Sequence, residues 1–140
     1  MARSGGRDLR VYVDGGARGN PGPAGIAAVV CDAEGELLEE RSEPIGSATN
    51  NVAEYRALLL GIERAAALGA TRLELIGDSE LIVRQVKGEY KVKEPVLQEL
   101  HRQVREALEG FDQWSIRHVR REENAEADRL VNEELDRIES

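Results

Sequence analysis

The chain has 140 residues, and its 19 Lys and Arg against 27 Asp and Glu give a net charge of −8. This length suits one domain with a single core. The acidic balance excludes a protein that coats nucleic acid non-specifically, so a polyanionic partner has to meet a local basic patch or a bound metal.

We expect one domain over residues 1–140, with residues 1–7 as a flexible N-terminal tail. The lone cysteine, Cys31, cannot form an internal disulfide and lies in a strand-like run, where free cysteine behaves as a small apolar group. The sequence shows neither the apolar segment of a secretory signal nor a membrane-spanning run. These features predict a cytoplasmic protein without a membrane partner, and we expect a monomer.

The first half of the sequence predicts three strands and a long helix. Alternating apolar residues or β-rich composition mark the strands, and apolar residues at helical spacing mark the helix. These elements span residues 9–14, 25–31, 36–44 and 51–68. The Gly- and Pro-rich residues 14–23 predict a loop between the first two strands, and Gly69 suits the end of the helix. The three strands are expected to form an antiparallel meander.

The second half predicts a strand, two helices, a strand and a last helix. These elements span residues 72–78, 79–86, 95–108 and 113–119, followed by a helix that Asn124 can cap. The order is β-β-β-α-β-α-α-β-α, and strands that follow helices favour right-handed parallel crossovers. The expected fold is α/β, a five-stranded mixed sheet with helices on both faces.

Four carboxylates stand at strand ends or helix starts, where packing does not require them. They are Asp14, Glu54, Asp78 and Asp128. Each has a structural alternative: Asp14 as a turn opener before glycines, Glu54 in a capping box with Asn51, Asp78 as the cap of a helix starting at Ser79, and Asp128 as a first-turn acid favoured by the helix dipole.

The joint pattern favours a metal site. Asp14 and Asp78 should lie side by side if their strands are parallel neighbours. Four like charges at one rim destabilise a fold unless metal neutralises them. Two divalent ions about 4 Å apart would activate water and stabilise the leaving oxygen of a phosphoryl displacement, so the residues predict a metal-dependent phosphodiesterase.

The chain resembles the type 1 ribonuclease H family from about Val11 to Leu135. The resemblance is carried by four motifs in order: Val13–Gly16 with Gly19–Gly25, Thr49–Glu54, Asp78–Ser79 and Asn124–Asp128. It implies a ribonuclease H-like fold and hydrolysis of the RNA strand of RNA/DNA hybrids with Mg²⁺ or Mn²⁺, leaving 5′-phosphate and 3′-hydroxyl ends. The four acids match the catalytic, metal-binding carboxylates.

The resemblance also implies substrate contacts. Asn20, Asn50 and Asn51 match positions that read the RNA minor groove and its 2′-hydroxyls, and Thr49 matches a contact to a DNA phosphate. Short amides beside glycine loops and a helix N-terminus suit such groups.

The link between the second and third helices departs from many bacterial members. Those members carry a basic helical protrusion, whereas residues 86–95 form a short link here, as in the shorter, archaeal-like subtype. Within it, Lys87, Lys91 and Lys93 beside Tyr90 are candidate phosphate contacts, with a merely solvated loop as the alternative.

Two further side chains are candidate catalytic assistants. Some family members use a histidine before the last catalytic acid, and His118 matches by its offset of ten residues from Asp128, although a half-buried place at a strand end is the alternative. Arg121, seven residues before Asp128, is the preferred candidate to contact the scissile phosphate. Trp114 and Tyr12 are interpreted as core or strand-face aromatics.

Three functions compete with a strict hybrid-cleaving enzyme. A relaxed nuclease would also cut double-stranded RNA or RNA-DNA junctions, because fewer DNA-strand contacts reduce selectivity. A non-catalytic hybrid-binding module would keep Asn20, Asn50 and Asn51 without needing four acids. An acidic structural domain would use its carboxylates only as caps and bind no metal.

Overall fold

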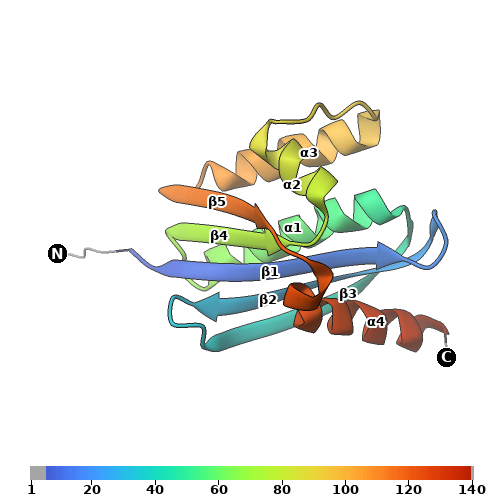
Figure 1. Cartoon of the computed structure of the whole chain (residues 1–140), viewed down its shortest axis with the longest axis horizontal. Helices are drawn as coiled ribbons and strands as arrows, with labels where there is room; N and C mark the ends of the chain where they lie inside the picture. The colour runs from blue at the N-terminus through green and yellow to red at the C-terminus, as the bar shows by residue number, and fades with distance from the viewer. Residues whose placement is uncertain (1–5, 140) are drawn as a thin grey trace.

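The computed structural model describes residues 6–139, and its elements follow the predicted order (Figure 1). The strands are β1 (Asp8–Ala17), β2 (Gly22–Asp32), β3 (Leu37–Ala48), β4 (Arg72–Gly77) and β5 (Gln113–His118). The helices are α1 (Asn50–Ala67), α2 (Glu80–Lys87), α3 (Pro95–Leu108) and α4 (Ala125–Glu139), and a 3₁₀ turn, Arg121–Asn124, precedes α4.

The five strands form one mixed sheet in the order β3-β2-β1-β4-β5. β1, β2 and β3 pair as an antiparallel meander, whereas β4 pairs in parallel with both β1 and β5. The predicted mixture of parallel and antiparallel pairing is confirmed. The arrangement places β1 at the centre of the sheet, with the first aspartate of the predicted site near its carboxyl end.

Helices cover both faces of the sheet, as predicted. α1 lies behind the sheet in Figure 1, with α3 above it in this view, and α4 lies in front of β2 and β3. The larger core lies between the sheet and α1, and Tyr55, Leu75 and Leu108 are among its fully buried side chains. A smaller cluster packs α4 against the other face through Val29, Leu130 and neighbouring residues.

The predicted loop between the first two strands is wrong in extent. β1 continues to Ala17 and β2 begins at Gly22, so the two strands pair as far as Ala17 with Ala24. The chain turns within residues 18–21 instead of 14–23. Gly19, with φ of +98°, and Gly22, packed against the Arg18 backbone, do belong to the turn, but Gly15 lies within β1 and permits the close approach of α1. Local composition does not distinguish these two uses of glycine.

Two exposed regions differ in how they are held. Residues 1–5 of the expected tail lie outside the described residues, but the Arg7 N–H donates to Thr71 Oγ1 at 2.7 Å, so Arg7 is fixed against the turn before β4. At one of the two edges of the sheet, β3 pairs only with β2 and carries Arg41, Glu43 and Pro44. Among the described residues, no helix has the length and apolar character needed to cross a bilayer.

Candidate active site

Asp14 and Asp78 emerge side by side from neighbouring parallel strands. β1 and β4 are paired from Asp8 with Arg72 as far as Tyr12 with Ile76, so each aspartate lies two residues beyond the last pair. β4 ends there, while β1 continues along β2. A cleft can open where the two strands part, because neither strand fills the space between them.

Glu54 reaches the same point because Gly15 lets α1 approach β1. A Cβ on Gly15 would stand 2.3 Å from the Ala53 carbonyl oxygen and 2.8 Å from the Glu54 nitrogen, so a larger residue does not fit. The Gly15 N–H donates to Glu54 Oε1 at 3.2 Å. The capping-box alternative is wrong, since Thr49 is the N-cap and its Oγ1 accepts from the Val52 N–H.

Asp78 is not a helix cap either. Ser79 caps α2, because its Oγ accepts from the Ile82 N–H. The Asp78 side chain is 2% exposed, and both its carboxylate oxygens are buried without a hydrogen-bond partner among the described residues. Burial of a carboxylate is costly unless donors or cations compensate its charge. The guanidinium of Arg121, with Nε 3.8 Å from Asp78 Oδ2, supplies part of that compensation.

The three acids converge, and the fourth lies beside them. Asp14, Glu54 and Asp78 each offer an oxygen, and these atoms all lie within 4.8 Å of one another. Asp128, in the first turn of α4, is outside this tight group but lines the same cleft of about 570 Å³. The expected rim of four acids is therefore a close group of three with one neighbour.

The electrostatics of the cluster favour a bound cation. Burial, followed by the charges of Asp78 and Asp128, raises the pKa of Asp14 from 3.8 to about 8. Burial, followed by the charges of Asp14 and Asp78, raises the pKa of Glu54 well above 4.5. Arg121 opposes both shifts without cancelling them. Hard oxygen donors in a negative potential are the environment that Mg²⁺ and Mn²⁺ prefer.

The structure separates the two candidate assistants. Arg121 lines the cleft with the acids, and its side chain is 73% exposed, so it is accessible to a ligand. His118 is exposed at the end of β5, paired with Gly77, rather than half-buried, and it is not among the residues that line the cleft. Of the two candidates, the structure therefore places only Arg121 among the residues that line the cleft.

The predicted substrate-reading residues form one connected group at the other side of the cleft. Asn20 Oδ1 accepts from the Asn50 N–H, and Asn50 Oδ1 accepts from the Ala17 N–H, both at 2.9 Å. Asn51 lines the cleft beside Glu54, and Thr49 caps α1 directly before them. Because these bonds occupy the oxygens of Asn20 and Asn50, their side-chain amino groups are the donors left for a ligand.

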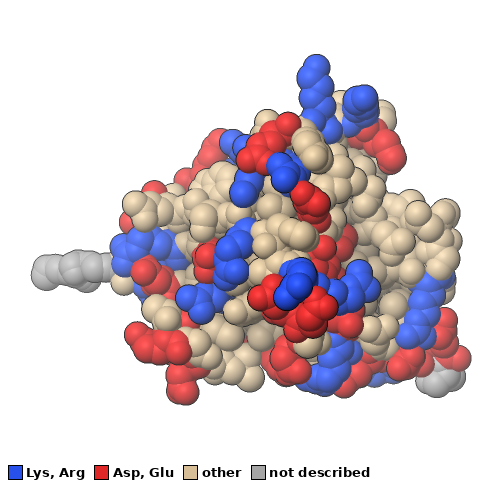
Figure 2. Space-filling model, in the orientation of Figure 1, with Lys and Arg blue, Asp and Glu red and all other residues tan. Residues whose placement is uncertain are grey.

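The link between α2 and α3 presents the only lysines of the chain. Lys87, Lys91 and Lys93 are all exposed, as is Tyr90, and none of these lysines has an ion pair among the described residues. Figure 2 shows basic side chains projecting from this end of the molecule. Three exposed lysines without ion pairs among the described residues thus lie close together in the sequence, and their positive charge is available to a polyanion.

Sequence reasoning missed two side chains that line the acidic cleft. Arg18 lies in the turn after β1 and pairs with Asp136 at 2.8 Å and with Glu139. Asn132 lies one turn after Asp128, and its Nδ2 donates to the Asp128 carbonyl oxygen. The i, i+4 spacing of Asp128 and Asn132 was a usable signal, but the pairing of Arg18 across the fold was not.

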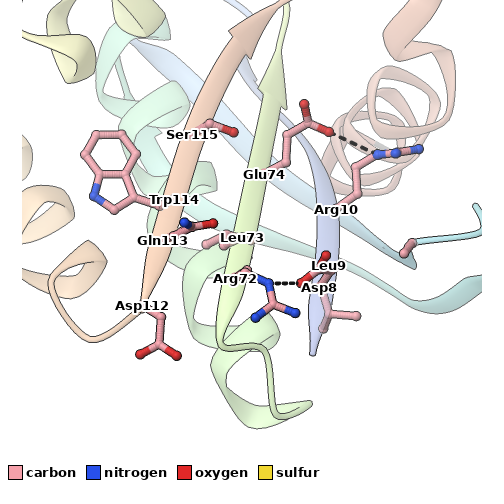
Figure 3. Close-up of a pocket in the computed structure, with 11 residues that line it drawn as sticks. Asp8, Leu9, Arg10, Arg72, Leu73, Glu74, Asp112, Gln113, Trp114 and Ser115 are labelled. Carbon is pink, nitrogen blue, oxygen red and sulfur yellow. Dashed lines mark hydrogen bonds and ion pairs between the residues drawn. The ribbon is translucent and has the colours of Figure 1, made fainter. Parts of the chain in front are cut away.

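A second hollow lies at the opposite end of the sheet and carries no comparable cluster. This groove of about 650 Å³ is lined by the first residues of β1, β4 and β5 (Figure 3). Its charges neutralise one another, since Arg72 pairs with Asp8, and Arg10 pairs with Glu74 at 3.1 Å. Trp114 points away from these pairs. This groove therefore lacks the close group of buried acids that lines the cleft.

The fold and the cleft define the class of protein, an α/β domain with a ribonuclease H-like sheet. The structure of RNase H1 from the halophilic archaeon Halobacterium salinarum NRC-1 matches with a TM-score of 0.90 and 45% identity, covering 92% of this chain and 98% of that chain. LC11-RNase H1, isolated from compost by a metagenomic approach and solved in complex with RNA/DNA hybrid, matches with a TM-score of 0.90 and 47% identity, covering 94% and 99%.

Sequence comparisons identify the family. The model described as "Reverse transcriptase-like" matches residues 12–134. Ribonuclease HI of H. salinarum is 46% identical over 94% of this chain and 66% of its own length, and the bifunctional protein Rv2228c of Mycobacterium tuberculosis is 46% identical over 90% and 35%. The chain thus spans about two thirds of the first relative and about a third of the second. It belongs to the ribonuclease H family.

Proposed function

We propose that the chain is an endoribonuclease that hydrolyses the RNA strand of RNA/DNA hybrids, leaving 5′-phosphate and 3′-hydroxyl ends. The observation that carries this proposal is the group of three carboxylates within 4.8 Å, in a chain similar to an RNase H1 that was solved with a hybrid. Membership of the ribonuclease H family supports it further.

The residues of the cleft fit divalent metal. Both Asp78 oxygens are buried without a hydrogen-bond partner among the described residues, and the neighbouring acids raise the pKa of Asp14. Asp14, Glu54 and Asp78 would hold the metal, with Asp128 as the outer ligand. A pair of Mg²⁺ or Mn²⁺ ions, when bound, would supply an activated water and neutralise charge on the leaving oxygen.

The remaining residues position the substrate. The amino groups of Asn20, Asn50 and Asn51 suit the 2′-hydroxyls of the RNA strand, and Thr49, at the N-terminus of α1, suits a DNA phosphate. The exposed guanidinium of Arg121 suits the scissile phosphate, because it is always charged and presents several donors. The unpaired lysines of the α2–α3 link suit the DNA backbone.

Asp14→Asn tests the catalytic assignment. The exchange keeps the shape of the side chain and removes the charge that holds metal, so we expect the cleavage rate to fall at least ~10³-fold. Cleavage of a 5′-labelled RNA/DNA hybrid, with Mg²⁺, Mn²⁺ or chelator, measures it. Asp112→Asn, at an exposed position outside the cleft, is the matched control.

The same assay separates the competing functions. Undiminished cleavage by Asp14→Asn, or cleavage in chelator, contradicts the assignment of the acids. Equal rates on hybrid, double-stranded RNA and RNA-DNA junctions would indicate the relaxed nuclease instead. Binding of the hybrid without cleavage in either metal would indicate the non-catalytic module.

A further inference from the structure

Asn124 links two parts of the chain that carry the acids. It is the last residue of the 3₁₀ turn before α4 and is 1% exposed. Its Nδ2 donates to the Val13 carbonyl oxygen at 2.8 Å, across 111 residues of sequence. Asp14 follows Val13 directly, and Asp128 lies one helical turn after Asn124. The sequence predicted Asn124 as a helix cap, and the structure shows a tether to β1 instead.

The tether stands where the sheet pairing between β1 and β4 ends. The last parallel pair is Tyr12 with Ile76, and the Val13 carbonyl lies just beyond it on the side of Gly77. A Cβ on Gly77 would be 3.9 Å from that oxygen. No further residue of β4 pairs with β1 there, and the Asn124 amide supplies the donor that a continued ladder would have given.

The identity of this residue is not explained by packing alone. Asn124 Oδ1 is buried without a hydrogen-bond partner among the described residues. An unpaired buried amide oxygen costs free energy comparable to a lost hydrogen bond, which an apolar residue of similar size would avoid. The hydrogen bond from Asn124 Nδ2 therefore comes together with the unfavourable burial of Asn124 Oδ1.

We propose that Asn124 is a positioning residue for the acid cluster. Its single bond fixes the Val13–Asp14 peptide and the start of α4 relative to each other, and so sets the separation between Asp14 on one side and Arg121 and Asp128 on the other. Asn124 is buried and is not among the residues that line the cleft, so it would act through these neighbours and not by contact with metal or substrate. This inference rests on the proposed metal-dependent nuclease function.

A second tether of α4 provides a matched control. Ser42 on β3 donates to Glu134 Oε2 at 2.9 Å and holds the far half of α4 to the sheet. Ser42→Ala removes one hydrogen bond between a strand and α4, and Asn124→Ala removes one between a strand and the turn that leads into α4. Only the Asn124 bond lies next to an acid of the cluster.

The test measures Mn²⁺ affinity by calorimetry, the melting temperature, and kcat and KM on an RNA/DNA hybrid. For Asn124→Ala we expect Mn²⁺ affinity and kcat to fall by about 10–100-fold, as for other side chains that orient metal ligands, while KM stays within about twofold because substrate contacts remain. Ser42→Ala should lower the melting temperature and leave Mn²⁺ affinity and kcat unchanged. If Asn124→Ala does not fold, the same measurements are made on Asn124→Ser. Its hydroxyl is too short to reach the Val13 carbonyl, so the same changes in Mn²⁺ affinity and kcat are expected.

The outcomes distinguish the inference from the function on which it rests. Wild-type affinity and kcat in a folded Asn124 variant, with only the melting temperature lowered, would overturn the positioning role alone. A wild-type protein that neither binds Mn²⁺ nor cleaves the hybrid would overturn the proposed function and this inference together.

Discussion

At the scale of single residues, the geometry of the cleft depends on Gly15. The Gly15 position lies so close to the first turn of α1 that a side chain there would overlap the backbone of Ala53. The Gly15 N–H also holds Glu54 Oε1. A residue without catalytic chemistry therefore decides whether a glutamate of another element reaches the aspartates.

Gly15→Ala should consequently impair both stability and activity. We expect a loss of about 1–3 kcal/mol in the free energy of unfolding from overpacking and a fall of about 10²-fold in cleavage rate, since Glu54 would move by a fraction of a helix diameter. Urea denaturation and the hybrid assay measure the two effects. Gly110→Ala, where a Cβ meets only ordinary contact at 3.5 Å, is the control. Full activity of Gly15→Ala would show that the position of Glu54 does not depend on the close contact between α1 and β1 at Gly15.

The sequence revealed the acids but not all of their surroundings. Asp14 and Asp78 were predictable because a strand period ends at each of them, and the strand order then brings them together. Asn124 was interpreted as a cap because the nearest usable pattern is local, whereas its partner lies 111 residues away. Glu54 had a plausible local partner for the same reason, and only the approach of α1 to β1 removed that alternative.

At the scale of elements, the α2–α3 link is short but well fixed. Gln85 Nε2 donates to the Lys91 carbonyl oxygen and Gln98 Nε2 to the Val92 carbonyl oxygen, at 3.3 and 2.9 Å. Arg84 lies over the Tyr90 ring at 5.4 Å. A link held by side chains of both flanking helices presents its lysines at little further cost in conformational entropy.

Replacing Lys87, Lys91 and Lys93 together by Ala should therefore weaken substrate binding. We expect KM for the hybrid to rise about tenfold or more at low salt, with kcat little changed, and the dependence of binding on salt to become less steep. Steady-state kinetics at several salt concentrations measure this. Arg72, Arg102 and Arg117→Ala carries the same net charge and should leave KM unchanged. A solvated link, the alternative reading of this segment, predicts equal KM for both triple variants.

At the scale of the whole molecule, the acid cluster makes the free energy of unfolding depend on pH. The folded protein keeps a proton on Asp14 up to about pH 8, whereas the unfolded carboxyl loses it near pH 3.8. The resulting stabilisation is complete below the unfolded value and is lost as the pH rises through the folded one. The raised pKa of Glu54 acts in the same direction.

The metal-free protein should therefore become less stable between pH 5 and pH 8. The free energy of unfolding should fall by up to about 1.4 kcal/mol per pH unit for each such group. The acids whose pKa is lowered, such as Glu39 and Glu126, affect stability only at lower pH. Urea titrations in chelator measure the trend, and Asp14→Asn should flatten it. Stability that rises over this range in wild-type protein would show that the acids are not buried as a group.

The fold as a whole was largely predictable from periodicity and chain connection. Strand and helix order, the antiparallel meander and the parallel crossovers all follow from local patterns and handedness. The boundaries of β1 and β2 did not, because glycines that permit close packing look like glycines that permit turning. Which of these two roles a glycine has depends on contacts with residues far away in the sequence, and local patterns do not reveal those contacts.

One of the two free edges of the sheet, the β3 edge, has a consequence for how copies of the molecule meet. β3 offers an unpaired row of backbone groups that an incoming strand could extend, yet Pro44 has no N–H to donate there, and the exposed charges of Arg41 and Glu43 oppose close approach. Other copies of the molecule should therefore not add a strand to the sheet at the β3 edge.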